Sequence, residues 1–279
     1  MDEQLLPAFS WPTRPEDQPR ILPVPWHDIT PAWAWGDATG AGVKVCIVDS
    51  GVDAGHSAIG GMLRGSVVVE RSDEEIAVRE DAPADVFGHG TACAGIIHQL
   101  APEGELYSVR VLGPNLKAGG DAFVAGLRWA IENGMDVINL SLSTRKQDHA
   151  LALHELADTA YFQNAILVAS ANNTPVHSYP WLFSSVISVA SHVEKDPYTF
   201  YYNPAPPVEF TAPGVDLEVA WLGGATMVGT GNSYATPHIA GLVARIMSKH
   251  RHLTPFQIKT VLYYTAKNVR QALQSKRSD

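Results

Sequence analysis

Short apolar runs recur along the chain, and each one ends in turn or polar residues. They are rich in β-branched residues and apolar at consecutive positions, which is typical of parallel strands covered on both faces. Six such runs predict strands at 43–53, 66–70, 105–112, 135–142, 165–171 and 186–192.

Helical periodicity fills several of the intervals between these runs. Phe123, Leu127, Ala130 and Ile131 form one apolar stripe in segment 119–134, which Asn133-Gly134 ends. Segments 147–163 and 234–250 show the same period, and 215–230 predicts a hairpin that turns at Gly223-Gly224. This alternation predicts an α/β fold: a three-layer, doubly wound, mostly parallel sheet with helices on both faces.

The two ends of the chain lack this periodicity. Pro- and Trp-rich sequence up to about residue 35 predicts an extended arm, with residues 1–23 outside the domain, 24–270 as one domain and 271–279 as a polar tail. The first residues are acidic and Pro-rich, unlike the basic and apolar regions of a secretory signal. A cytoplasmic location is therefore expected, with a secreted mature form as the alternative.

Composition excludes several classes of function. Hydrophobic residues make up 46% and charged residues 18%, an ordinary globular balance. The net charge of −9 argues against a nucleic-acid partner, and no apolar run approaches the ~20 residues that cross a bilayer. The two cysteines, Cys46 and Cys93, form no CxxC pair, and no HExxH pattern is present. No metal ligands are predicted.

Four polar clusters stand at strand ends or helix starts: DSGVD (49–53), GHGTACAG (88–95), ASANN (169–173) and GNSYATP (231–237). Ligands of doubly wound sheets bind at the carboxyl ends of the strands. Helix caps and turns explain any one cluster, but four at one edge indicate a functional site.

The residues in these clusters suit nucleophilic catalysis. A serine such as Ser233 needs a base to take its proton, and His89 can accept that proton and return it to a leaving amine. A buried carboxylate such as Asp49 would orient the imidazole, and the amide of Asn172 could stabilise an oxyanion. By itself Ser233 would be read as a helix N-cap and Asp49 as a turn residue. Asn173, directly after Asn172, is the alternative oxyanion donor.

The same motifs resemble those of the subtilisin-like (subtilase) serine proteases over roughly residues 24–270. VDSGVD is similar to the Asp motif of that family, GHGTACAG to its His motif and GNSYATPHIAG to its Ser motif. MDVINLSL resembles the substrate-binding strand, and ASAN the segment that carries the oxyanion asparagine. The resemblance implies a serine endopeptidase with Asp49, His89, Ser233 and Asn172 as its catalytic residues. His56 and His238 match structural histidines.

The resemblance also implies where a peptide substrate binds. An extended peptide would lie between Leu116, Lys117 and Ala118 on one side and Ser141, Leu142 and Ser143 on the other. Ala171 and Ser178 stand where the family usually has glycines, which predicts a small S1 pocket. Gly120 replaces an aromatic flap, which predicts an open S4 side. Asn232 replaces the usual threonine before the nucleophile.

No cofactor is expected. Segment 95–109 passes directly from the His motif to the next strand without the Asn-rich calcium loop of many relatives, so the strong family calcium site is predicted absent, while a weaker calcium site stays compatible with the sequence.

The expected partner is a peptide or protein, with no nucleic acid or membrane, and the oligomeric state is open. LLPAF (5–9) is loosely similar to an inhibitory segment, which gives a hypothesis that the arm occupies the cleft.

Two narrower hypotheses remain. One is a dedicated processing protease that removes leader peptides. The other is a catalytically silent pseudoprotease that binds peptides in the same cleft, although all three triad residues are present.

Overall fold

The computed structural model describes residues 24–71 and 75–278, and most strands in it join one sheet. The strand order is β3-β2-β4-β1-β5-β6-β7-β9-β8, and neighbours are parallel except at the edges, where β3 pairs antiparallel with β2 and β8 with β9. The strands are β1 Lys44–Asp49, β2 Leu63–Arg71, β3 Ile76–Glu80, β4 Glu105–Arg110, β5 Val137–Leu140, β6 Ile166–Ser170, β7 Ile187–His192, β8 Tyr201–Tyr202 and β9 Phe210–Pro213.

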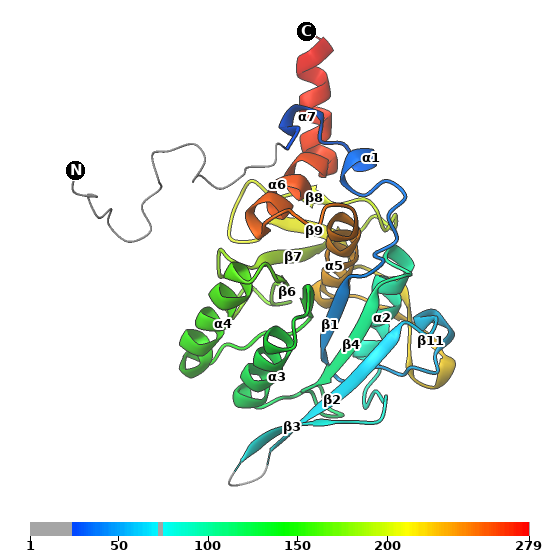
Figure 1. Ribbon diagram of the computed structural model, residues 1–279, viewed down its shortest axis with the longest axis vertical. Coiled ribbons are helices and arrows are strands. Elements are labelled where there is room, and N and C mark those ends of the chain that lie inside the picture. Colours follow the sequence, from blue (N-terminus) through cyan, green and yellow to red (C-terminus); the bar gives the residue numbers. More distant parts are fainter. Residues whose placement is uncertain (1–23, 72–74, 279) are drawn as a thin grey trace, which may run out of the picture.

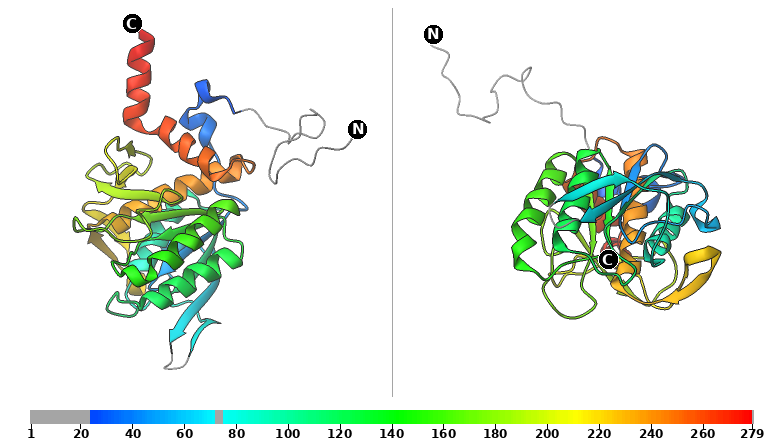
Figure 2. Two further views of the ribbon diagram at one scale, coloured as in Figure 1. Left: turned by 90° about the vertical axis from the view of Figure 1, so that its left-hand side faces the viewer. Right: turned by 90° about the horizontal axis from the view of Figure 1, so that it is seen from below.

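Helices cover both faces of this sheet (Figures 1 and 2). Helices α2 (His89–Leu100) and α5 (Asn232–Lys249) lie on one face, and α3 (Gly120–Glu132) and α4 (Ala150–Phe162) lie on the other. The shorter or peripheral helices are η2 Trp26–Asp28, α1 Pro31–Ala34, η3 Ser57–Ile59, η4 Gln147–His149, η5 Leu222–Gly224, α6 Pro255–Thr265 and α7 Lys267–Ser278. The predicted three-layer α/β architecture is confirmed.

The central strand β1 shows how one short run serves two cores. Val45 and Ile47 belong to the apolar cluster on the α2 and α5 face, whereas Cys46 and Val48 belong to the cluster on the α3 and α4 face. Successive side chains of a strand point to opposite faces, so a strand between two helical layers must be apolar at every position. This explains the unbroken apolar runs in the sequence.

Three expectations about peripheral segments have different outcomes. The hairpin is present, with β10 (Leu217–Ala220) antiparallel to β11 (Thr226–Gly229). The sequence after residue 23 is not extended throughout, because Thr30 caps the short helix α1. The expected boundary at residue 270 falls inside α7, so the polar tail continues a helix whose Val269 packs into the core. Residues 1–23, with the proposed inhibitory LLPAF segment, lie outside the described residues.

The strand order places a crevice at the end of β1. Strands β2 and β4 lie on one side of β1 and β5, β6 and β7 on the other, so the chain reverses its direction of winding there. Ligand sites of doubly wound sheets form at such a switch point, outside the carboxyl ends of the strands. Asp49 ends β1, and Ser141 directly follows β5. No helix in the described part of the chain is long and apolar enough to span a membrane.

Candidate active site

Asp49 and His89 meet at the carboxyl end of β1. His89 is the first residue of α2, and its Nδ1 lies 2.8 Å and 2.9 Å from the two carboxylate oxygens of Asp49. Both side chains are buried. A Cβ atom on Gly90 would come within 2.0 Å of the Gly51 carbonyl oxygen, so only glycine lets α2 start this close to the end of β1. Asp49 accepts the Nδ1 proton and thereby leaves Nε2 as the free, basic nitrogen.

A second carboxylate, Asp85, ties the segment before His89 to the segment after Asp49. Its oxygens accept five hydrogen bonds, from the N–H groups of Phe87 (2.9 Å), Gly88 (2.7 Å) and Thr91 (2.8 Å) and from the hydroxyls of Ser50 (2.8 Å) and Thr91 (2.7 Å). The helix start that carries His89 is therefore held by a charged acceptor four residues earlier. Asp85 is not among the site residues that the sequence predicted.

The pKa of His89 follows from these neighbours. Burial would lower the pKa of the imidazole, but the charge of Asp49, its hydrogen bond to Nδ1 and the charge of Asp85 together outweigh burial and raise the pKa above its ordinary value of 6.5. A raised pKa makes His89 a stronger base in its neutral form and stabilises the imidazolium that forms after proton transfer.

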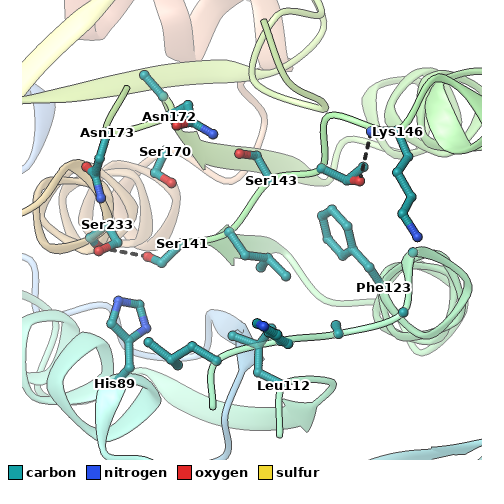
Figure 3. A pocket seen from close by; sticks show the side chains of 18 residues that line it. His89, Leu112, Phe123, Ser141, Ser143, Lys146, Ser170, Asn172, Asn173 and Ser233 are labelled. Atoms are coloured by element: carbon teal, nitrogen blue, oxygen red, sulfur yellow. Dashed lines mark hydrogen bonds between the residues drawn. The ribbon is translucent and has the colours of Figure 1, made fainter. Parts of the chain in front are cut away.

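Ser233 lies in the first turn of α5, and its hydroxyl faces His89 across the cleft (Figure 3). It does not cap the helix, since α5 begins at Asn232 and Gly231 occupies the N-cap position without a side-chain bond. The Ser233 carbonyl accepts a 2.8 Å hydrogen bond from the Ser141 hydroxyl, which links the nucleophile segment to the end of β5. Within the described chain the Ser233 hydroxyl and His89 make no hydrogen bond, as is common before substrate binds.

The two adjacent asparagines have different partners. The Asn172 side-chain oxygen accepts from the Thr174 N–H (3.0 Å) and hydroxyl (2.8 Å), which fixes the amide orientation. The Asn172 nitrogen points away from Ser233, whereas the Asn173 nitrogen points toward it (Figure 3). The Asn173 oxygen accepts the Asn232 N–H at 2.9 Å and so binds the start of α5. Both residues line the cleft with Ser233. Asn172 stays the predicted oxyanion donor.

Asn232, which replaces the family threonine, is a cross-link between three segments. Its side-chain oxygen accepts from the Ser191 N–H (2.9 Å) and hydroxyl (2.8 Å), and its NH₂ group donates to the carbonyls of Ala171 and Asn172 at 3.2 Å. A threonine hydroxyl cannot make all four bonds. The substitution therefore adds contacts that position the oxyanion segment relative to Ser233.

A cleft of about 480 Å³ runs past Ser233, and the predicted substrate-binding segments line it. The backbone groups of Ser141, Leu142 and Ser143 make no hydrogen bond elsewhere in the described chain, so they can pair with a peptide strand. Residues 113–117 form a tight turn just before Ala118. Leu116 has a φ of 55°, and the Lys117 carbonyl accepts the Gly113 N–H at 3.0 Å.

Ser178 ties together two segments beside the cleft. Its hydroxyl is fully buried, lies 2.9 Å from the Ser143 hydroxyl and accepts a 2.8 Å bond from the Trp181 indole N–H. Ser178 itself does not line the cleft within the described chain, and its hydroxyl acts through Ser143, which does. Ala171, the other residue in place of a glycine, is also buried and lines the cleft.

Cys93 lies under the catalytic residues. Its thiol is fully buried, 3.4 Å from the Ser141 hydroxyl and 3.7 Å from the Ser233 carbonyl oxygen. Burial and the charge of Asp49 raise its pKa well above the ordinary value, so the thiol stays protonated. Asp49, His89 and Cys93 are the one group of possible metal ligands found in the described residues. Because Asp49 already binds the His89 ring, we assign this group to the triad.

Other polar residues near the site support the fold. His56 accepts the Ala58 N–H at Nδ1, so its Nε2–H donates to the Ala225 carbonyl at 2.9 Å and holds the β10–β11 hairpin. His238 is buried and donates to the Tyr234 carbonyl. The ring of Tyr234 packs against His89 with centroids 5.4 Å apart. Tyr234 was not predicted as a site residue, although its position directly after Ser233 in the sequence is a signal for one.

Comparisons with known proteins agree with this geometry. The sequence profile of the subtilase family matches residues 40–278. Subtilisin DY of Bacillus licheniformis is 31% identical over 82% of this chain and 85% of its own length. Subtilisin E of Bacillus subtilis is 32% identical over 82% of this chain, and the minor extracellular protease Epr of the same organism is also 32% identical. The chain spans 61% of subtilisin E and 35% of Epr.

A solved structure is also similar. The crystal structure of a cold adapted subtilisin-like serine proteinase superposes with a TM-score of 0.66 at 25% sequence identity, covering 84% of this chain and 87% of its own.

Proposed function

Because this chain belongs to the subtilase family of serine proteases, we propose that it is a serine endopeptidase with Ser233 as its nucleophile. The observation that carries the proposal is the short contact of both Asp49 oxygens with His89 Nδ1, with Ser233 facing the same ring. This arrangement fixes the tautomer in which Nε2 can take the serine proton.

The reaction follows from the positions of these groups. The Ser233 oxygen attacks the peptide carbonyl while His89 accepts its proton, and the imidazolium then protonates the leaving amine. The Ser233 N–H has no partner within the described chain, as expected for a first-turn amide, and with the Asn172 NH₂ group it would bind the oxyanion. Water then hydrolyses the acyl-enzyme by the reverse proton transfers.

Labelling with a fluorophosphonate probe tests this proposal. Wild-type protein should be labelled, and Ser233→Ala should not be. Ser275→Ala removes an exposed serine of α7 and serves as the matched control, which should be labelled like the wild type. A wild-type protein that binds peptides but takes no label would instead be a peptide-binding pseudoprotease.

We further propose that the enzyme is selective, as a processing protease would be. The buried Ala171 supports this, because it lines the cleft where relatives usually have a glycine, and the Ser178 hydroxyl supports it by holding the Ser143 hydroxyl, which also lines the cleft. A peptide-library profile with one dominant cleavage motif is the expected result. Cleavage at many unrelated sites would contradict it.

A further inference from the structure

The cleft is positively charged, although the chain as a whole is acidic. Lys117 and Lys146 line it, and no aspartate or glutamate does, although the whole chain carries a net charge of −9. Within the described residues neither lysine ammonium takes part in a salt bridge or hydrogen bond. Both side chains are exposed. Two unpaired cations therefore border a groove without counter-charge.

Lys146 lies at the end of the cleft opposite Ser233 (Figure 3). Ser141, Leu142 and Ser143, with their unpaired backbone groups, lead from the nucleophile toward it. An extended peptide advances about 3.3 Å per residue. A side chain three residues before the scissile carbonyl, the P4 residue, would therefore stand about 10 Å from P1, at the Lys146 end.

Two aspartates, Asp121 and Asp148, lie near this end of the cleft, but neither lines it or forms a salt bridge with Lys146 in the described residues. Asp121, next to Gly120 at the start of α3, has carboxylate oxygens 3.7 Å from Arg71 Nη1 and 3.5 Å from His149 Nδ1. The His149 ring lies so close to Gly120 that a Cβ atom there would come within 2.0 Å of it. An aromatic flap at residue 120 therefore cannot stand between Lys146 and a substrate.

We propose that the end of the cleft distant from Ser233 selects peptides with an acidic side chain at P4, with Lys146 as the main specificity residue and Lys117 contributing from the facing wall. This inference rests on the proposed peptidase function, because it concerns the substrate of the same cleft. Glutamate at P4 would gain an ion pair at Lys146, whereas lysine at P4 would be repelled.

The test uses quenched fluorescent peptides that share alanine at P1 and differ only at P4: Glu, Gln or Lys. An exposed ion pair contributes about two- to fivefold, so the wild-type kcat/KM should be about two- to fivefold higher for Glu than for Gln. The ratio should fall as salt is raised, because ions screen exposed charges. Lys146→Gln should bring the ratio close to one.

Arg145→Gln is the matched control. Arg145 is the exposed neighbour of Lys146, does not line the cleft, and its loss changes the net charge by the same amount. It should leave the Glu-to-Gln ratio as in the wild type. Equal cleavage of the Glu and Gln peptides, or a Lys146→Gln variant that keeps the preference, would overturn the proposal.

The same comparison can be made without catalysis. Ser233→Ala protein and fluorescein-labelled peptides give affinities by anisotropy, with the same Glu-over-Gln preference expected and the same dependence on Lys146. If wild-type protein cleaves no peptide and takes no fluorophosphonate label, the peptidase function fails, while the anisotropy ratio still decides the charge preference.

Discussion

Asp85 holds the start of the helix that carries His89, four residues further along the chain. One of its carboxylate oxygens accepts the N–H of Gly88, the residue directly before His89, and the other accepts both donors of Thr91. The base is thus positioned by backbone contacts on both sides of it. The charge of Asp85 also contributes to the raised pKa of His89.

Asp85→Asn should shift the pH profile of the enzyme. Activity requires neutral His89, so it rises as pH passes the His89 pKa. Removing the Asp85 charge lowers that pKa, so the acid limb of kcat/KM should move to lower pH. The plateau activity should also fall, because an amide has one acceptor oxygen instead of two. Asp158→Asn, a surface change on α4, should leave the limb in place, and an unmoved limb in Asp85→Asn would refute the electrostatic role.

Asn172 and Asn173 form a natural pair of matched variants. Loss of one oxyanion donor lowers kcat by ~10²–10³, so Asn172→Ala should show a fall of that size with little change in KM. Asn173→Ala makes the same truncation and adds no charge, and it removes only the acceptor of the Asn232 N–H, so its kcat should fall far less. Single-turnover kinetics of both variants provide the measurement. A larger loss in the Asn173 variant would transfer the oxyanion role to that residue.

Ser178→Gly should enlarge the space for the P1 side chain. The Ser178 hydroxyl holds the hydroxyl of Ser143 on the cleft wall, so its loss frees Ser143 to move aside, and the ratio of kcat/KM for Phe over Ala at P1 should rise by about tenfold. Wild-type enzyme should prefer Ala to Phe in peptides that are otherwise identical. A strong wild-type preference for Phe would show that the pocket is not narrowed.

His238 should make the fold sensitive to acid. Burial lowers the pKa of His238 to about 4, below its ordinary value of 6.5. Between these values the unfolded chain binds a proton that the folded chain does not, so stability is lost as pH falls from about 6.5 to about 4. The shift corresponds to about 3 kcal/mol.

The corresponding measurement is urea unfolding at several pH values. His238→Gln cannot titrate, so its stability should fall less steeply over this pH range than that of the wild type. His154→Gln changes a half-exposed histidine of α4 and should keep the wild-type slope. Identical slopes for His238→Gln and wild type would exclude the effect.

Calcium removal should have little effect on stability. Helix α2 reaches β4 through residues 101–104, whose N–H groups at Ala101, Glu103 and Gly104 already donate to backbone carbonyls. This short turn leaves no loop of oxygen ligands of the kind that calcium requires. EDTA should change Tm by no more than about 2 °C by scanning calorimetry. A drop of ten degrees or more would reveal a calcium site elsewhere in the protein.

Local sequence determined much of this protein. Successive side chains of a strand point to opposite faces of the sheet, and helices cover both faces here. A strand covered in this way is therefore apolar at successive positions, and these continuous apolar runs allowed the strands and the α/β class to be predicted. The motifs around Asp49, His89 and Ser233 were equally informative, because each stands where a strand ends or a helix starts. The turn beside the cleft at residues 113–117 could not be predicted, because the left-handed Leu116 and the closing bond from Gly113 to Lys117 give no periodic signal.

Tertiary structure decided what depends on contacts between distant segments. Asn232 seemed a simple replacement for threonine, but it joins Ser191, Ala171 and Asn172, which are 41 to 61 residues away. Lys117 was expected beside the substrate, but only the fold placed Lys146 on the same cleft, which no carboxylate in the described chain lines. The local sequence predicts which side chains lie at the end of a strand or the start of a helix. Hydrogen-bond partners and local charge depend on which segments the folded sheet brings together, and only the three-dimensional structure contains that information.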